Sequence, residues 1–116
     1  KRQGREHVCT RKFDFQGLRE VLEQLQGKPV YFTLDLDVLD PSVFPGTGTP
    51  EPGGVSFDQL RQAATLVCEK ARIVGCDVNE LSPHYDASGA STAVACKIVR
   101  EMLLALDKEK RKTGGM

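Results

Sequence analysis

Two acidic residues, Asp35 and Asp37, close a run of β-branched, aromatic and aliphatic residues. The run covers residues 30–36 behind Pro29 and is too short for a helix, so it predicts a buried strand of a parallel sheet. Strand side chains alternate between faces, which would place both carboxylates on one face with their Cα atoms about 6.6 Å apart. Two charges at that distance repel by roughly 2 to 3 kcal/mol at an effective dielectric constant of ~20, and a divalent cation between them reverses the sign.

The chemistry that this acidic pair could do is metal binding. Ligands in open α/β sheets collect at the carboxyl ends of strands, where Asp35 and Asp37 are expected. Carboxylate oxygens suit Mg²⁺ or Mn²⁺, and two metals about 3.5 to 4 Å apart can share one bridging carboxylate. The sequence contains two histidines, His7 and His84, so the remaining ligands would have to come from outside it. The simpler alternative is that arginines or backbone amides pair with the two acids, and that Asp40 caps the turn that follows.

A second apolar run, residues 72–78, also predicts a buried strand, and the acids Asp77 and Glu80 stand at its end. Between the two predicted strands, residues 45–54 form a loop rich in proline and glycine. Proline stiffens such a loop and glycine permits backbone turns that other residues avoid, so we expect a rigid connection of defined shape. A phosphate-binding loop is disfavoured, because no GK[ST] follows and the GxG does not lead into a helix.

Two helices are predicted from their caps and their periodicity. The first covers residues 15–26, where apolar residues recur at helical spacing after a possible cap at Asp14 and before Gly27. The second begins at Ser56, which forms a capping box with Gln59 and is followed by an amphipathic stretch. Both helices are expected to cover the sheet.

The last predicted helix, residues 91–107, is apolar on nearly all sides, which indicates packing against more than one neighbour. Residues 108–116 are charged and glycine-rich and are expected to fray. The order helix, strand, helix, strand, helix is typical of an α/β fold in which helices cover both faces of a parallel sheet, a three-layer α/β/α arrangement. Because such a sheet needs more strands than the two predicted here, we expect the chain to be part of a larger fold.

Composition places the chain among ordinary globular domains. Its 116 residues fit one domain, and its 16 basic and 16 acidic residues give a net charge of zero. The mixed charges argue against partners such as nucleic acid or a membrane surface, and no apolar run approaches the ~20 residues of a membrane span. Four cysteines without a CxxC pair favour reduced thiols in the cytoplasm, with Cys68, Cys76 and Cys96 as small buried hydrophobes. The start at Lys1 without a signal segment or a methionine leads us to expect a truncated cytoplasmic chain.

Two stretches carry a family resemblance, LDLDVLDPSVFPGTGTPEPGG and VGCDVNELSPHYDASGASTAVACKIVREML. Over residues 28–106 the sequence resembles the C-terminal half of the ureohydrolase family, which includes agmatinase, arginase, guanidinobutyrase and formimidoylglutamase. The PGTGTPEPGG and ELSPHYD forms resemble agmatinases most. The resemblance implies an arginase-like fold of which this chain covers the C-terminal portion: a leading segment and helix (1–27), a metal- and substrate-binding core (28–107) and a tail (108–116).

The resemblance implies a role for each of four residues. Asp35 would bridge two Mn²⁺ ions, and Asp37 would complete the coordination of one of them. Glu80 would receive the planar guanidinium group of the substrate, and Thr49 would support Glu80 and the pocket floor. The implied reaction is hydrolysis of agmatine to putrescine and urea, in which the metals, Asp37 and Glu80 stabilise a tetrahedral intermediate. A homo-oligomer, a trimer or hexamer, is implied for the full-length protein.

Three alternatives remain open. The histidine-bearing Gly-Gly-Asp-His and Asp-x-His-x-Asp motifs of the family are absent, so the chain could be an inactive fragment or a module that serves assembly alone. It could instead belong to another ureohydrolase, such as arginase, guanidinobutyrase or formimidoylglutamase. The run into Asp35 and Asp37 also resembles the first motif of haloacid-dehalogenase-type phosphatases, in which the first Asp is a nucleophile and the second a general acid. The proline-rich loop that follows and the lack of a later lysine motif argue against that class.

Overall fold

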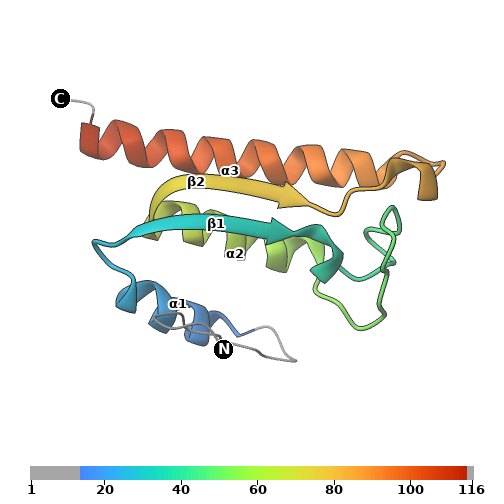
Figure 1. Cartoon of the computed structure of the whole chain (residues 1–116), viewed down its shortest axis with the longest axis horizontal. Coiled ribbons are helices and arrows are strands. Elements are labelled where there is room, and N and C mark those ends of the chain that lie inside the picture. Colours follow the sequence, from blue (N-terminus) through green and yellow to red (C-terminus); the bar gives the residue numbers. More distant parts are fainter. Residues whose placement is uncertain (1–13, 115–116) are drawn as a thin grey trace.

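The computed structural model describes residues 14–114, so His7 and Cys9 lie outside the described residues. The helices and strands follow the predicted order, and a short 3₁₀ helix comes after each strand (Figure 1). The elements are α1 (Phe15–Gln24), β1 (Pro29–Asp35), the 3₁₀ helix η1 (Leu36–Val38), α2 (Phe57–Lys70), β2 (Arg72–Asn79), the 3₁₀ helix η2 (Pro83–Tyr85) and α3 (Ala90–Gly114). The alternation of helix and strand predicted from the sequence is therefore confirmed.

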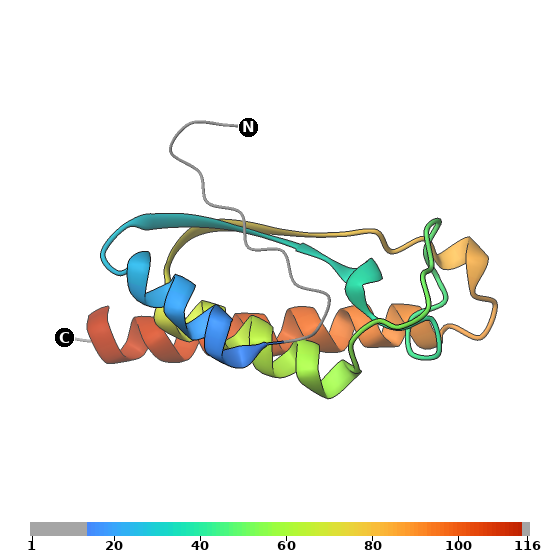
Figure 2. The same cartoon turned by 90° about the horizontal axis from the view of Figure 1, so that it is seen from below.

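Strands β1 and β2 pair in parallel and form a two-stranded sheet. The register sets Leu34 opposite Val78 and Asp35 opposite Asn79, so the two strands end side by side. All three helices lie on the same side of this sheet (Figure 2). The predicted α/β class and the parallel pairing are confirmed. The described residues make up two of the three predicted layers, the sheet and one layer of helices.

The prediction that both strands are buried on both faces is wrong for the described part of the chain. Leu34 faces the helices and is buried, whereas Tyr31 and Thr33 on the opposite face of β1 are exposed. On β2, Val74 is as exposed as Tyr31, at 61%. The apolar run is typical of a strand covered on both sides, but one helical layer covers one side only. The exposed face is thus a surface whose composition fits a further layer.

The predicted helix caps are confirmed. The backbone N–H of Gln16 donates to the Asp14 carboxylate at 3.1 Å, which caps α1. At the start of α2, the Ser56 hydroxyl accepts from the Gln59 amide and the Gln59 side chain accepts from the Ser56 amide, which completes the capping box. Helix α1 ends two residues before the predicted boundary, because the chain turns there toward Gly27, whose φ is +79°.

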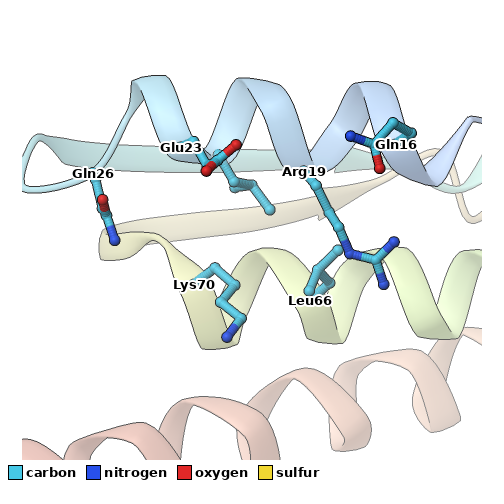
Figure 3. Close-up of a pocket in the computed structure, with 7 residues that line it drawn as sticks. Gln16, Arg19, Glu23, Gln26, Leu66 and Lys70 are labelled. Carbon is cyan, nitrogen blue, oxygen red and sulfur yellow. The ribbon is translucent and has the colours of Figure 1, made fainter.

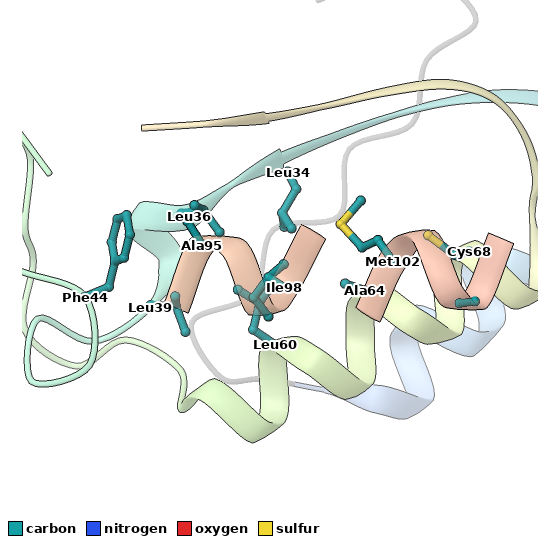
Figure 4. Packing of buried hydrophobic residues seen from close by; sticks show 11 residues of the cluster. Leu34, Leu36, Leu39, Phe44, Leu60, Ala64, Cys68, Ala95, Ile98 and Met102 are labelled. Carbon is teal, nitrogen blue, oxygen red and sulfur yellow. The ribbon is translucent and has the colours of Figure 1, made fainter. Parts of the chain in front are cut away.

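The core lies between the sheet and helices α2 and α3 (Figure 4). Three of its most deeply buried side chains, Leu36, Leu39 and Phe44, follow directly on the end of β1. The whole buried cluster consists of Leu34, Leu36, Leu39, Phe44, Leu60, Ala64, Cys68, Ala95, Ile98, Met102 and Ala105. Core packing therefore fixes the position of the segment that carries Asp35 and Asp37, because their neighbours in the sequence are anchored beneath the sheet.

Helix α3 is longer than predicted. It continues to Gly114, whereas the sequence predicted fraying after Asp107. Side chains one turn apart pair along this extension, Arg111 with Asp107 and Lys112 with Glu109. Exposed pairs at this spacing stabilise a helix weakly, and together with the lack of a helix breaker before Gly114 they account for the extra turns.

The prediction that α3 packs on more than one side is wrong for residues 14–114. The buried side chains recur every three or four residues along one face: Ala95, Ile98, Met102 and Ala105. On the opposite face Leu103 is 60% exposed and Leu104 is 52% exposed. The helix is apolar on nearly all sides, as the sequence indicated, but one side alone has a neighbour.

The cysteine prediction is confirmed for one residue and wrong for two. Cys68 is buried, whereas Cys76 and Cys96 are free and exposed. Cys76 lies on β2, whose second edge has no partner strand among the described residues, and Cys96 lines an open groove on α3. Among the described residues, no helix has the length and the apolar character that crossing a membrane requires.

The one-sided packing of α3 predicts unequal effects of two truncations. Ile98→Ala removes a fully buried side chain and should lower the free energy of unfolding by about 2 to 5 kcal/mol. Leu103→Ala, on the exposed side, should change it by no more than about 0.5 kcal/mol. Urea denaturation of the purified chain and its two variants measures both values. Equal losses would show that the outer side of α3 is already covered in solution.

Candidate functional site

Asp35 and Asp37 lie together at the end of β1, although not in the predicted geometry. Asp35 is the last residue of the strand, and Asp37 belongs to η1. The Asp35 carboxylate accepts a hydrogen bond from the backbone N–H of Asp37 at 3.1 Å, which curls the chain out of the extended conformation. The prediction that both side chains project from the same face of an extended strand is therefore wrong. The two acids are brought together instead by the Asp35 side chain, which caps the 3₁₀ turn.

Glu80 joins this pair from the neighbouring strand. Because Asp35 lies opposite Asn79, Glu80 follows at the same end of the sheet. Partial desolvation, contact with the Asp37 carboxyl and the negative charges of Asp37 and Glu80 raise the pKa of Asp35 above its usual range. None of the ion pairs formed within residues 14–114 involves these three acids, so the alternative of arginine partners finds no support there. The site is an acidic cluster that a cation would relieve.

Glu80 also adopts an unusual backbone conformation. Its φ is +79°, and it is the one residue other than glycine with a positive φ among those described. Residues with a Cβ avoid this region, where a steric cost of about 1 to 2 kcal/mol is typical. The residue is exposed and directly follows the end of β2.

Thr49 contacts the acidic cluster from the proline- and glycine-rich loop. Its hydroxyl donates to Oδ2 of Asp37 at 2.7 Å. The family resemblance implied support for Glu80, whereas this hydrogen bond goes to Asp37. A neutral donor fixes the orientation of a carboxylate and leaves its charge in place, so Thr49 positions Asp37 without neutralising it.

One end of this loop is held by Asp40. Its carboxylate accepts from the hydroxyl and amide of Ser42 and from the amides of Gly53, at 2.9 Å, and Gly54, at 3.2 Å. The Ser42 hydrogen bonds and the Gly53 and Gly54 amides lower the pKa of Asp40 to about 2. A Cβ at Gly54 would lie 2.5 Å from the Asp40 backbone nitrogen, so the close approach requires glycine there. Asp40 caps the turn, as the sequence predicted.

The other end of the loop is held by a clamp that sequence reasoning missed. The Gly46 amide donates to the Ser91 hydroxyl at 2.7 Å, and Ser91 in turn donates to Asp86 at 2.6 Å. The Gly46 carbonyl accepts from the Ser82 amide, two residues beyond Glu80. Hydrogen bonds from Ser88 and Ser91 hold the pKa of Asp86 well below its usual range. The available signal was the run of Asp and Ser residues just before α3, which is typical of a helix N-terminus.

A polar network on the open face of the sheet was also missed. Asp77 accepts from the Tyr31 hydroxyl at 3.0 Å, from the Thr33 hydroxyl at 2.6 Å and from the Asn79 side-chain amide. Thr33 also accepts from Asn79 at 3.2 Å. The sequence feature that could have revealed this network is a polar residue at every second position of both strands, next to the acids. These hydrogen bonds link β1 to β2 just before Asp35 in the sequence.

The donor set of the acidic cluster fits part of a metal site. Carboxylate oxygens of Asp35 and Asp37 are ligands that Mn²⁺ or Mg²⁺ accepts. Within residues 14–114, however, no three His, Cys, Asp or Glu side chains are arranged to hold a metal ion. His84 lies in η2 with its ring against that of Tyr85 and is exposed. The described residues thus hold two candidate ligands and no complete metal site.

A separate pocket between α1 and α2 does not coincide with this site. It has a volume of about 430 Å³ and is lined mostly by polar and charged side chains, among them Arg19, Glu23 and Lys70 (Figure 3). It lies in the helical layer, and none of the four predicted site residues lines it. Mixed charges on a shallow groove are typical of a solvated helix surface.

Comparisons with known proteins decide the family. The family model described as Arginase family matches residues 1–105. The chain belongs to the arginase family. It is similar to an agmatinase of Bacillus anthracis, with 46% identity over 95 residues that cover 80% of the chain and 33% of the relative. It is also similar to the mitochondrial guanidino acid hydrolase of Homo sapiens, with 44% identity over 77% of the chain and 25% of the relative.

The structural comparison agrees with the arginase family. The crystal structure of a putative agmatinase from Clostridium difficile matches with a TM-score of 0.74 and 50% identity, over 80% of this chain and 34% of that one. The chain thus spans a quarter to a third of the length of these relatives, between 25% and 34%. The haloacid-dehalogenase interpretation of Asp35 and Asp37 finds no support in these matches, and the ureohydrolase resemblance is confirmed.

The low pKa of Asp40 predicts a pH-dependent contribution to stability. Its folded-state pKa of about 2 lies below its usual value of about 3.9, so the stabilisation is present above that value and is lost as the pH falls toward 2. Asp40→Asn should therefore lower the free energy of unfolding at pH 7. The difference in this free energy between the variant and the unchanged chain should shrink between pH 4 and pH 2. Urea denaturation over this range tests the prediction. Ser42→Ala, which removes one of the donors, should show a smaller loss in the same window.

The backbone strain at Glu80 predicts a gain in stability on substitution by glycine. Glu80→Gly removes the steric cost of the positive φ and should raise the free energy of unfolding by up to about 1 kcal/mol after the entropic cost of glycine. Glu80→Ala removes the same charge but keeps a Cβ, so it should gain less than the glycine variant. Identical stabilities of the two variants would show that charge repulsion, and not the backbone, determines the effect.

Proposed function

We propose that this chain carries the C-terminal part of the active site of an agmatinase-like ureohydrolase, which hydrolyses agmatine to putrescine and urea. The observation that supports it most is the convergence of Asp35, Asp37 and Glu80 at one end of two parallel strands, uncompensated by basic side chains of the described residues. Family membership gives this acidic cluster its chemical context. The first relatives reported above are named for reactions on guanidino compounds, which favours a substrate of that class.

Asp35 and Asp37 are the residues that would hold manganese. Their carboxylates would hold manganese through oxygen ligands, which suit this ion. A bound metal pair supplies Lewis-acid chemistry, which makes water a nucleophile at neutral pH. Thr49 keeps one oxygen of Asp37 engaged and so holds the carboxylate in a single orientation. The remaining ligands would come from the part of the family fold that this chain does not span.

Glu80 is the residue that would bind the guanidinium group. A carboxylate matches the planar fork of N–H donors with its two oxygens, and Glu80 is exposed at the end of the sheet. Binding there would bring the guanidinium carbon close to the two aspartates. The loop clamps at Asp40 and Asp86 would keep the surrounding backbone from moving when the charged substrate enters.

The proposal also concerns the rest of the substrate molecule and the oligomeric state of the protein. The similarity to a human guanidino acid hydrolase makes a substrate with a carboxylate tail, such as 4-guanidinobutyrate, the second candidate. An inactive chain that serves assembly alone is the third, because the described residues supply only two metal ligands. We further propose that the active form is a cytoplasmic trimer or hexamer.

Urea release tests the function. The chain is co-expressed with a Bacillus anthracis agmatinase polypeptide from which the segment matching this chain has been removed, and is assayed with Mn²⁺ on agmatine and on 4-guanidinobutyrate. Agmatine turnover by the co-expressed pair, and none by the chain alone, supports the proposal. Faster turnover of 4-guanidinobutyrate would identify that compound, and not agmatine, as the substrate. A pair that associates and binds Mn²⁺ without turnover of either compound would favour the assembly alternative.

Two substitutions in the active pair separate the roles of the acids. Asp35→Asn should abolish both manganese binding and urea release, because it removes a charged ligand. Glu80→Gln should leave manganese bound, raise KM and lower kcat, because an amide is a weaker partner for a guanidinium ion. Metal analysis of the purified variants and steady-state kinetics on agmatine measure these effects. Full manganese occupancy in Asp35→Asn would refute its role as a ligand.

A further inference from the structure

The ring of Tyr85 lies against the loop that carries Thr49. One edge of the ring approaches Gly48, because a Cβ built on that glycine would lie 3.8 Å from Cε2 of Tyr85. The imidazole of His84 packs against the same ring, with 4.1 Å between the two ring centroids. Tyr85 is nevertheless 59% exposed. Aromatic surface that stays open after both contacts is available to a ligand.

A series of short contacts sets the distance between Tyr85 and the acidic cluster. Thr49 follows Gly48 in the chain, and its hydroxyl lies 2.7 Å from Oδ2 of Asp37. By this route the Tyr85 ring is no more than about 14 Å from the Asp37 carboxylate. A guanidino compound with a four-carbon tail is about 8 Å long, and contacts of roughly 3 to 6 Å at its two ends let it span that distance.

Backbone hydrogen bonds hold the helix η2, and with it Tyr85, against this loop. The Ser82 amide donates to the Gly46 carbonyl at 2.7 Å, and the Tyr85 amide donates to the Ser82 carbonyl at 3.1 Å. Pro83 occupies the start of η2 and restricts its backbone. Figures 1 and 2 show η2 and the loop at the same end of the molecule, beyond the carboxyl ends of both strands. A ring fixed in this way binds a ligand at a low entropic cost.

The charge of the surrounding segments favours a cation beside this ring. Residues 29–60 and 73–96 supply both strand ends, the loop and η2, and they contain eight carboxylates but no lysine or arginine. Such an excess of negative charge attracts an ammonium group and repels a carboxylate. The face of a tyrosine ring also attracts a cation, through the quadrupole of its π-electrons. Both effects favour the same tail on a guanidino substrate.

We propose that Tyr85 is a specificity-determining residue of the hydrolase and that its ring receives a primary ammonium group at the end of the substrate. The inference rests on the proposed function and defines the substrate class of the same site, a guanidino compound with an amine tail. Glu80 would bind the guanidinium group at one end of this molecule, and Tyr85 the ammonium group at the other. A cation–π contact at a partly exposed ring changes affinity by a factor of about 2 to 30.

Kinetics on three compounds that differ only in the tail test this role. Agmatine ends in an ammonium group, pentylguanidine in a methyl group and 4-guanidinobutyrate in a carboxylate. The enzyme is the active pair, this chain co-expressed with the shortened Bacillus anthracis agmatinase polypeptide. Tyr85→Leu should raise KM for agmatine about 2- to 30-fold and leave KM for pentylguanidine unchanged. Tyr85→Phe keeps the ring face and should behave as the unchanged pair, with equal manganese content in all three proteins.

A binding measurement separates this inference from the hydrolase activity. Equilibrium dialysis of the same compounds against the manganese-loaded pair gives Kd values that do not depend on turnover. Weaker binding of agmatine, and not of pentylguanidine, to the Tyr85→Leu pair supports the role of Tyr85 even if no compound is hydrolysed. A pair that binds none of the three compounds overturns both the proposed function and this inference.

Three results would overturn the inference alone. The first is a Tyr85→Leu pair with unchanged KM and Kd for agmatine. The second is an equal loss for agmatine and pentylguanidine, which would make the role of the ring structural. The third is an unchanged pair that prefers 4-guanidinobutyrate to agmatine. In each case, hydrolysis of a guanidino compound by the pair leaves the ureohydrolase activity standing.

Discussion

Crowding of like charges at the ends of two parallel strands is the constraint on which the rest of the structure depends. Asp35, Asp37 and Glu80 meet there because the strand register brings their backbone positions together. Neutral donors hold two of these acids, a backbone amide for Asp35 and the Thr49 hydroxyl for Asp37. Neutral donors orient carboxylates without cancelling their charge, and a cluster held in this way stays attractive to cations such as divalent metals and guanidinium groups.

The loop around this acidic cluster is held by two further carboxylates that serve structure alone. Asp40 gathers the amides of Gly53 and Gly54, and Asp86 reaches Gly46 through Ser91. Both carboxylates are satisfied by several donors, which is why their pKa values lie below the usual range. The chain therefore surrounds Asp40 and Asp86 with several donors each, whereas Asp35 lies beside the acids Asp37 and Glu80.

The packing within residues 14–114 covers the sheet and α3 on one side only. The core beneath β1 is dense enough to anchor the turn after Asp35, but one face of the sheet, one edge of β2 and the outer side of α3 have no neighbour within residues 14–114. Side chains on these surfaces, such as Val74 and Leu104, have the composition of a protein interior.

The sequence by itself determined the order of helices and strands and the caps at Asp14 and Ser56, because these features depend on local periodicity and capping, and its short motifs led to the proposal of four site residues. It also indicated an α/β fold larger than this chain. Tertiary structure alone decided that β1 stops at Asp35, that Thr49 binds Asp37, that Glu80 takes a positive φ, and that Cys76 and Cys96 are exposed. Those outcomes depend on which segments contact one another in the folded protein. The local sequence around an apolar residue is the same whether or not another segment covers its side chain.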